Sequence, residues 1–308
     1  MKIAVMGAGG IGGYYGGLLA RAGHDVTLIA RGAHLQALRD RGLAIHSVHG
    51  DFTVPVAATH DPGEVGPNEL VLFCVKAYDV EAAADSVRPL VGPTTTLLTL
   101  QNGIDTPEKL AARFGWEHVL AGLTHIESSI EAPGVIRQTT PLRRIVFGEW
   151  NGTTTPRGAW LAGVLQEAGI TAVFTAQIQV ALWEKFVFIC ALAGLTTLLR
   201  ASIGQILDTA EGRALYRLAL EECAGVGRAR GIPLDADVVD RTYAFTRGVP
   251  PTMKSSMLRD LEAGKPLELE TLSGVVVQLG AEAGVPTPVH LCIYTALRPR
   301  ARGGTRQG

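Results

Sequence analysis

The chain has 308 residues, which is enough for two domains of about 150 residues each, so a miniature scaffold is excluded. Its 28 Lys and Arg residues against 29 Asp and Glu residues give a net charge of −1, which argues against nucleic-acid binding. Hydrophobic residues make up 47% and charged residues 19%, the composition of an ordered globular protein and not of a disordered one.

In the first half of the chain, from residue 2 to about residue 174, short apolar runs alternate with longer amphipathic stretches. This pattern predicts βα units around a mostly parallel sheet. The expected strands are Lys2–Met6, Asp25–Ile29, Leu70–Lys76, Thr96–Gln101, Val119–Leu123 and Ile145–Gly148, and the expected helices begin near Gly10, Ala33, Asp79, Asp105 and Arg157. We therefore expect an α/β domain of the Rossmann type over residues 1–175.

The sequence pattern is different in the second half of the chain, because helical periodicity continues with no convincing strand in between. The periodic stretches are residues 177–199, 205–230, 267–282 and 289–297. The apolar run Phe186–Leu199 is shorter than a bilayer crossing requires, so we expect a buried helix and no membrane span. An all-α domain over residues 176–308 is predicted, ending in a basic, frayed tail from Arg298.

The cysteines and the start of the chain indicate a cytoplasmic protein. No Cys-x-x-Cys spacing occurs, so we interpret Cys74, Cys190, Cys223 and Cys292 as buried thiols in a reducing compartment. The apolar start runs at once into glycines that would break the helix of a signal peptide. His46 and His49 lack a third ligand in any recognised spacing, so no metal site is expected.

A glycine-rich loop follows the first predicted strand. Its sequence, Gly7-Ala8-Gly9-Gly10-Ile11-Gly12, fits G-x-G-x-x-G and opens a predicted helix, the context that this dinucleotide-binding motif requires. Gly7 would permit the tight turn, Gly9 would let the backbone approach a pyrophosphate, and Gly12 would let helix and strand pack closely. The alternative is a glycine-rich turn without a ligand. We expect these six residues to bind the cofactor.

The second predicted strand ends beside the expected position of the adenosine ribose. NAD-binding proteins usually place an Asp or Glu there, but this chain has Ala30 and Arg31. A guanidinium cannot accept a hydrogen bond from a ribose hydroxyl, whereas it can pair with a 2′-phosphate. The sequence therefore favours NADP(H) as the cofactor, the alternative being that Arg31 is a solvated surface residue.

Lys76 and Asn102 follow two further predicted strands. Ligands of doubly wound sheets lie outside the carboxyl ends of the strands, so both side chains are expected at the cofactor crevice. Alternatively, Lys76 marks where the strand reaches water and Asn102 belongs to a simple turn. His125, after another predicted strand, is a possible crevice residue, although packing within the fold is the simpler interpretation.

Two segments in the second half of the chain contain side chains that could take part in catalysis. Lys185 lies in an apolar helix, where it either extends to the surface or is held in a cleft with a lowered pKa. Ser256 and Glu268 belong to a stretch of hydroxyls and acids around a turn. Spacing alone also allows a capped helix start and a solvated face for that stretch.

Taken together and in this order, these motifs resemble those of the ketopantoate reductase family. They are the glycine loop, Val75-Lys76-Ala77, Gln101-Asn102-Gly103, Trp183-Glu184-Lys185 and the segment from Ser255 to Glu270. The resemblance spans nearly the whole chain. It implies a 2-dehydropantoate 2-reductase that uses NADPH to form (R)-pantoate on the pathway to pantothenate and coenzyme A. It also implies an active site between the two domains and a homodimer assembled through the helical half.

The resemblance also assigns roles to residues. Lys185 resembles the general acid that gives a proton to the ketone oxygen and also binds the substrate, and Glu268 would keep that lysine charged and oriented. Asn102 and Lys76 resemble residues near the nicotinamide and substrate. Ser256 resembles a substrate contact of the helical domain.

The chain departs from the family where the family carries asparagines that bind substrate. Ile189 and Ala193 stand one and two helical turns after Lys185, and Met253 stands three residues before Ser256. An apolar pocket discriminates poorly for a substrate hydroxyl. Other readings therefore stay open: a reductase of a different 2-oxo acid or ketone, a related β-hydroxyacid or opine-type dehydrogenase, or a non-catalytic NADP(H)-binding regulator.

Overall fold

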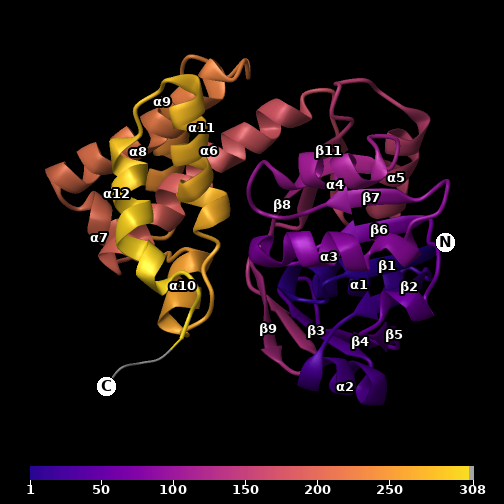
Figure 1. Ribbon diagram of the computed structural model, residues 1–308. Coiled ribbons are helices and arrows are strands. Elements are labelled where there is room, and N and C mark those ends of the chain that lie inside the picture. Colours follow the sequence, from indigo (N-terminus) through magenta and orange to yellow (C-terminus); the bar gives the residue numbers. More distant parts are fainter. Residues whose placement is uncertain (305–308) are drawn as a thin grey trace. The chain divides into compact units, whose positions relative to one another are not determined.

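The computed structural model describes residues 1–304, which divide into the two compact units of Figure 1. Unit 1 comprises residues 1–101 and 105–178, and unit 2 comprises residues 102–104 and the chain from residue 179 onward. Unit 1 is an α/β domain with a mainly parallel sheet and unit 2 is helical, which confirms the predicted fold class. The domain boundary between residues 175 and 176 stays a prediction, and nothing in the sequence indicated that residues 102–104 group with the helices.

In the described part of unit 1, eight strands form one sheet in the order β12-β11-β8-β7-β6-β1-β2-β5. Neighbouring strands are parallel except for β8 and β11. The strands are β1 (Lys2–Met6), β2 (Asp25–Ile29), β5 (Ala57–Thr59), β6 (Leu70–Phe73), β7 (Thr96–Thr99), β8 (Val119–His125), β11 (Arg144–Gly148) and β12 (Thr171–Phe174). The predictions of β6 and β7 were too long, because the chain leaves the ladder at Phe73 and Thr99.

The two faces of this sheet bury different side chains, because successive residues of a strand point to opposite sides. Ile3 and Val5 of β1 join a core with α1 (Gly10–Arg21), α2 (Gly32–Arg41) and α5 (Pro156–Glu167). Ala4 and Met6 join a second core with α3 (Val80–Ser86) and α4 (Thr106–Phe114). Helices therefore cover both faces, which explains why the central strands are apolar without alternation.

A second, four-stranded sheet packs on the other side of α1. Its order is β4-β3-β10-β9, with β3 (Leu43–Ser47), β4 (Phe52–Val54), β9 (Ser128–Ala132) and β10 (Val135–Gln138). Glycines on two faces of α1 allow both sheets to approach. A Cβ on Gly16 would lie 2.9 Å from Leu28, and one on Gly17 would lie 3.0 Å from Leu43. The sequence pattern did not predict this small sheet, nor did it predict β5 and β12.

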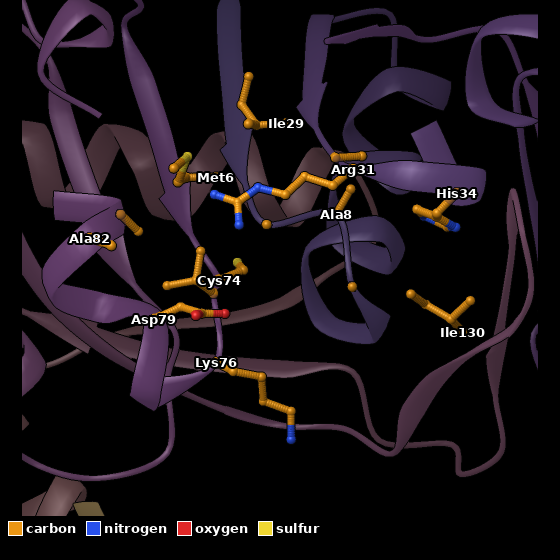
Figure 2. A pocket seen from close by; sticks show the side chains of 15 residues that line it. Met6, Ala8, Ile29, Arg31, His34, Cys74, Lys76, Asp79, Ala82 and Ile130 are labelled. Carbon is orange, nitrogen blue, oxygen red and sulfur yellow. The ribbon is translucent and has the colours of Figure 1, made fainter. Parts of the chain in front are cut away.

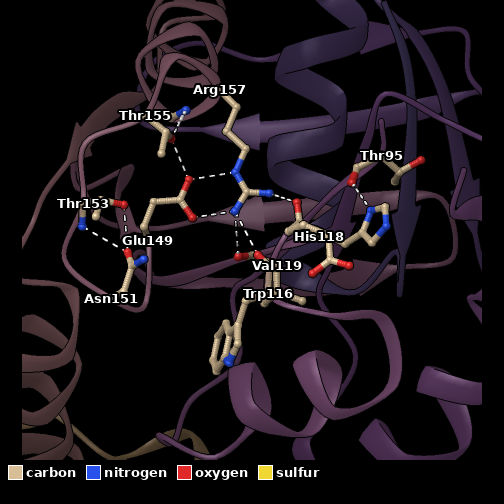
Figure 3. Close-up of polar contacts among 11 residues, drawn as sticks. Thr95, Trp116, His118, Val119, Glu149, Asn151, Thr153, Thr155 and Arg157 are labelled. Atoms are coloured by element: carbon tan, nitrogen blue, oxygen red, sulfur yellow. Dashed lines mark hydrogen bonds and ion pairs between the residues drawn. The ribbon is translucent and has the colours of Figure 1, made fainter. Parts of the chain in front are cut away.

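The buried carboxylate of Glu149 and the half-buried guanidinium of Arg157 form an ion pair that fixes the start of α5 (Figure 3). Arg157 Nε donates to Glu149 Oε1 over 2.7 Å, and Arg157 also donates to the backbone carbonyls of Trp116 and Glu117. Burial by itself would raise the pKa of Glu149, but the hydrogen bonds from Arg157 and Thr155 hold it below its usual value. The pair thus connects α5, the end of β11 and the loop before β8.

Unit 2 is built from helices. They are α6 (Ile178–Leu199), α7 (Ile203–Leu207), α8 (Ala210–Ala229), α9 (Val238–Gly248), α10 (Ser256–Glu262), α11 (Val275–Ala283) and α12 (Pro288–Leu297), with a π-helical segment at Glu270–Gly274 before α11. The carboxylate of Glu222 in α8 accepts hydrogen bonds from the backbone amides of Val289 and His290, which caps α12. His290 is fully buried, and its Nε2 lies 3.0 Å from the carbonyl oxygen of Ala219.

Helix α6 is long and apolar enough to cross a membrane by length and composition. However, 61% of its most apolar stretch is buried inside the structure, as in the core helix of a globular protein. The expectation of a buried helix over Phe186–Leu199 is thus confirmed in its main part, although Leu199 itself is exposed.

Three further predictions needed correction. The helix expected over residues 205–230 is broken, because the Thr209 side chain accepts a hydrogen bond from Gly212 and starts α8 afresh. The first part of the tail, up to Gly304, is held by backbone hydrogen bonds and is not frayed. Leu267 N donates to Ala301 O, and Gly304 N donates to Gly264 O. The predicted fraying of residues 305–308 lies outside the described residues. Cys292 is exposed and Cys74 is half-buried, so only Cys190 and Cys223 are the buried thiols predicted.

Candidate functional site

A pocket of about 290 Å³ opens at the carboxyl ends of β1, β2 and β6 in unit 1 (Figure 2). Ligands of open α/β sheets bind at this edge. The lining residues come from the glycine loop, the end of β2, the start of α2, the segment after β6, α3 and β9. They are Met6, Gly7, Ala8, Gly9, Ile29, Ala30, Arg31, His34, Cys74, Val75, Lys76, Asp79, Ala82, Ala83 and Ile130.

The glycines of the loop have different reasons to be glycine. Gly7 has φ +99°, and a Cβ on Gly12 would lie 2.1 Å from the carbonyl oxygen of Gly7, so the chain's own packing requires both. A Cβ on Gly9 would meet nothing within 4 Å, and its φ of −73° suits any residue. The absence of a side chain at Gly9 thus leaves open space, which is the room that a pyrophosphate needs.

The N-terminus of α1 is the natural place for that anion. Gly9 is its N-cap residue and offers no side-chain cap, so the first amides of the helix and its dipole are available to a phosphate. Strand β9 closes over the loop, because a Cβ on Gly10 would lie 2.4 Å from the carbonyl oxygen of Ser128. These features fit a bound dinucleotide, whose diphosphate residues 7–12 would hold.

Arg31 and Lys76 bring positive charge to the pocket. Arg31 follows β2 and directly precedes α2, and its guanidinium extends into the pocket (Figure 2). Lys76 follows β6 and lines the pocket from another side. An anionic ligand is therefore favoured here on charge as well as shape.

Gln101 is a residue of this region that sequence analysis missed. Its side chain is buried, and Nε2 donates to the carbonyl oxygens of Phe73 and Val75 over 2.7 and 3.3 Å. These bonds hold the chain that leads from β6 to Lys76. Its Oε1 is buried and has no hydrogen-bond partner in the described part of the chain. The sequence feature that could have indicated Gln101 is its place as a polar residue at the end of an apolar strand, directly before Asn102.

The pocket residues that the sequence did not indicate include His34, Asp79 and Ile130. His34 and Asp79 lie at the starts of helices, where the sequence showed only ordinary helix beginnings. Ile130 belongs to β9, a strand that the sequence did not reveal. Only the tertiary structure brings these three side chains to the ends of β1, β2 and β6.

The second cluster of functional interest lies in unit 2, around Lys185. Lys185 is half-buried on α6, and its Nζ donates a hydrogen bond to Oδ1 of Asn102 over 3.0 Å. Desolvation lowers the pKa of Lys185 from 10.5 to about 8, while the negative charge of the buried Glu268 acts in the opposite direction. The structure thus brings together three side chains that the sequence singled out far apart along the chain.

The remaining candidates are placed as follows. Ser256 is the exposed first residue of α10, whereas the neighbouring Ser255 is buried, caps the helix at Leu258 N and lies 2.8 Å from the hydroxyl of Thr196. His125 is half-buried at the end of β8.

The two histidines considered as metal ligands have other partners. His46 Nδ1 lies 2.6 Å from a carboxylate oxygen of Glu131. His49 Nε2 lies 2.9 Å from the carbonyl oxygen of Pro141. Both contacts belong to the small sheet and its loops.

The fold and the pocket define a dinucleotide-binding α/β protein that carries a separate helical domain. Matches to two protein-family models identify the family within this class. Residues 3–152 match the family described as ketopantoate reductase PanE/ApbA, and residues 177–301 match its C-terminal counterpart. The chain belongs to the ketopantoate reductase family, a family of oxidoreductases.

Individual relatives agree with this assignment. An uncharacterized oxidoreductase, YkpB, of Bacillus subtilis is 34% identical over 97% of this chain and 98% of its own. The 2-dehydropantoate 2-reductase of Mesorhizobium japonicum is 30% identical over 97% of both chains. A crystal structure of a PanE/ApbA family ketopantoate reductase from Ralstonia eutropha has a TM-score of 0.91 at 34% identity and covers 98% of both chains.

A more distant structure shares the fold alone. A D-mandelate dehydrogenase, solved with NADH and anilino(oxo)acetate, has a TM-score of 0.89 at 23% identity and covers 98% of both chains.

Proposed function

We propose that the chain is an NADPH-dependent 2-dehydropantoate 2-reductase, which forms (R)-pantoate for pantothenate and coenzyme A biosynthesis. The observation that carries the proposal is the cluster of Lys185, Asn102 and Glu268 in a chain of this family. A lysine whose pKa is lowered to about 8 is matched to proton transfer near neutral pH. Lys76, Ser256 and the glycine loop complete the proposed cofactor and substrate contacts.

In this proposal Lys185 is the general acid. At pH 7, about one unit below its pKa of about 8, roughly ten lysines in eleven carry the proton. Addition of hydride to a ketone carbon puts negative charge on the oxygen, which the ammonium stabilises and then neutralises by giving up its proton. Asn102 fixes the direction of Nζ, and Glu268 keeps the amine charged. The nicotinamide cofactor, when bound, supplies the hydride.

The choice of NADPH is supported by Arg31. Its guanidinium reaches into the pocket from the end of β2, where an acidic residue would favour NADH. A planar guanidinium suits a phosphate on the ribose better than it suits a hydroxyl.

One observation favours a second candidate, a reductase of a different 2-oxo acid or ketone. Ile189 and Ala193 lie on the same face of α6 as Lys185, at spacings of four and eight residues, and Ala193 is buried. An apolar surface beside the proton donor suits a substrate with an apolar or aromatic group. The fold shared with D-mandelate dehydrogenase makes an aryl-substituted 2-oxo acid a useful member of a substrate panel.

Consumption of NADPH with ketopantoate and a panel of other 2-oxo acids, including an aromatic one, tests these proposals. Lys185→Ala serves as the blank, and Lys265→Ala, which removes an exposed lysine of unit 2, is the matched control. The proposal predicts efficient turnover of ketopantoate that Lys185→Ala abolishes and Lys265→Ala preserves. Turnover of another 2-oxo acid in place of ketopantoate would shift the assignment to the second candidate. Tight NADPH binding with no turnover of any substrate would instead indicate a non-catalytic regulator.

We also propose a cytoplasmic homodimer assembled through unit 2. Two free cysteines are buried, as suits a reducing compartment, and large apolar side chains of unit 2 are exposed: Leu199, Leu218, Phe245 and Leu291. Light scattering coupled to size exclusion should give a mass of about twice 32.6 kDa. Phe245→Asp should convert the dimer to a monomer if that residue is in the interface, and a monomeric native protein would refute the proposal.

A further inference from the structure

The dinucleotide pocket contains an acidic side chain that the proposed use of NADPH does not explain. Asp79 follows β6 and precedes α3, and it lines the same pocket as Arg31 (Figure 2). The two charges come from opposite walls, Arg31 from the end of β2 and Asp79 from the end of β6. A ligand in the pocket therefore meets the negative group of Asp79 as well as the positive groups of Arg31 and Lys76.

Within the described residues neither charged group has a side-chain partner, although the carboxylate of Asp79 lies at the N-terminus of α3, where the helix dipole favours a negative charge. Within residues 1–304, no hydrogen bond or ion pair engages the Asp79 carboxylate or the Arg31 guanidinium, and both residues are exposed. The two acids within α3 differ from Asp79, since Glu81 and Asp85 both pair with Arg113. Moreover, Arg31 sits at the N-terminus of α2, where the helix dipole disfavours a cation. A structural role therefore does not account for Arg31.

The two groups have opposite preferences for the 2′ position of an adenosine ribose. A carboxylate accepts a hydrogen bond from a 2′-hydroxyl, which is the role of the acid that usually ends the second strand of NAD-binding folds. This chain has Ala30 and Arg31 there, and its pocket carboxylate comes from Asp79 instead. A 2′-phosphate attracts the guanidinium of Arg31 but is repelled by Asp79.

We propose that Asp79 is a specificity-determining residue that weakens the binding of NADPH and supports the binding of NADH, so that the chain uses both cofactors. The inference rests on the proposed function as a nicotinamide-dependent reductase. If the carboxylate lay about 5 Å from a phosphate with about two charges, in water and at about 0.1 M salt, the repulsion would weaken binding roughly fivefold. The attraction of Arg31 for the phosphate offsets that loss of NADPH affinity, so the affinities for NADPH and NADH differ little.

Equilibrium titration of the purified full chain with NADPH and with NADH tests the inference without any need for turnover. Asp79→Asn should bind NADPH roughly fivefold more tightly, because the repulsion is gone. It should bind NADH roughly threefold more weakly, because a neutral amide is a poorer acceptor than a carboxylate. Asp85→Asn, which removes the same charge from α3, six residues after Asp79 and outside the pocket, should leave both affinities unchanged.

Salt separates an electrostatic effect from a structural one. The NADPH gain of Asp79→Asn should shrink as salt rises from about 0.05 to 0.5 M, because the Debye length falls. An unchanged ratio of the two affinities in Asp79→Asn, or the same change in Asp85→Asn, would overturn the inference and leave the proposed reductase standing. Native protein that binds neither cofactor would refute the proposed function itself. Native protein that binds only NADH, with NADPH binding gained in Asp79→Asn, would support the inference and refute the choice of NADPH.

Discussion

The pH dependence of turnover tests the assignment of Lys185 most directly. If the protonated amine is the acid in ketone reduction, kcat/KM is constant below the pKa of Lys185 and falls tenfold per pH unit above it. The structure puts that pKa at about 8, well below the 10.5 of an ordinary lysine. The fall should therefore begin near pH 8 in the native enzyme, measured with the best substrate of the panel.

Glu268→Gln should shift this fall in kcat/KM, the basic limb of the pH profile, to lower pH. The charge of Glu268 raises the pKa of Lys185, so its removal leaves desolvation unopposed and lowers the pKa further. A nearby opposite charge contributes about 1 to 3 pKa units, so we expect the limb to move down by about 1 to 2 units. At pH 8 the variant would then retain roughly 2% to 20% of native kcat/KM, with the loss recovered as the pH is lowered.

Glu270→Gln is the matched control, because it removes the same charge two residues away, where Glu270 is exposed and accepts a hydrogen bond from Tyr294. Its limb should stay near pH 8. A limb that does not move in Glu268→Gln, or that moves equally in Glu270→Gln, would contradict the role given to Glu268. A basic limb that persists in Lys185→Ala would move the acid to another residue.

Three further outcomes are expected. Gly9→Ala should weaken cofactor binding at an unchanged melting temperature, because its Cβ would enter open space. Gly12→Ala should lower the melting temperature, because its Cβ would lie 2.1 Å from a backbone oxygen. Equal melting temperatures in the two variants would contradict this difference. Arg157→Met should cost about 3 to 5 kcal/mol in urea unfolding, because it leaves the buried carboxylate of Glu149 unpaired. Since the native pKa of Glu149 is lowered, that loss should be largest above the unfolded pKa and should fade as the pH drops through the native one; a pH-independent loss would count against the ion pair. Arg31→Ala should weaken NADPH much more than NADH, and equal losses would exclude a contact with the 2′-phosphate.

The sequence by itself determined the parts of the fold that depend on local patterns. Strands β1 and β2 begin and end where their apolar runs do, and α1 begins directly after the glycine loop. These elements are visible locally because β1 is buried on both faces and because a glycine-rich turn between strand and helix is rare without a phosphate to bind. Lys76 and Asn102 could be singled out for the same reason, since each directly follows a predicted strand.

Other elements left no comparable signal. Strands β4 and β5 are three residues long, and β9 is mostly exposed, so none shows a periodicity that stands out. The antiparallel pairing of β11 with β8 follows from contacts between segments about twenty residues apart. The break between α7 and α8 depends on one capping hydroxyl, that of Thr209.

The candidate sites divide in the same way. Local sequence singled out Arg31, Lys185, Ser256 and Glu268, and the family resemblance assigned roles to the last three. Only the tertiary structure decided that Asn102 holds Lys185 and that Asp79 shares a pocket with Arg31. The reason is physical: periodicity and turn chemistry act over a few residues, whereas a pKa, a hydrogen bond or a charge pair depends on which distant segments fold against each other.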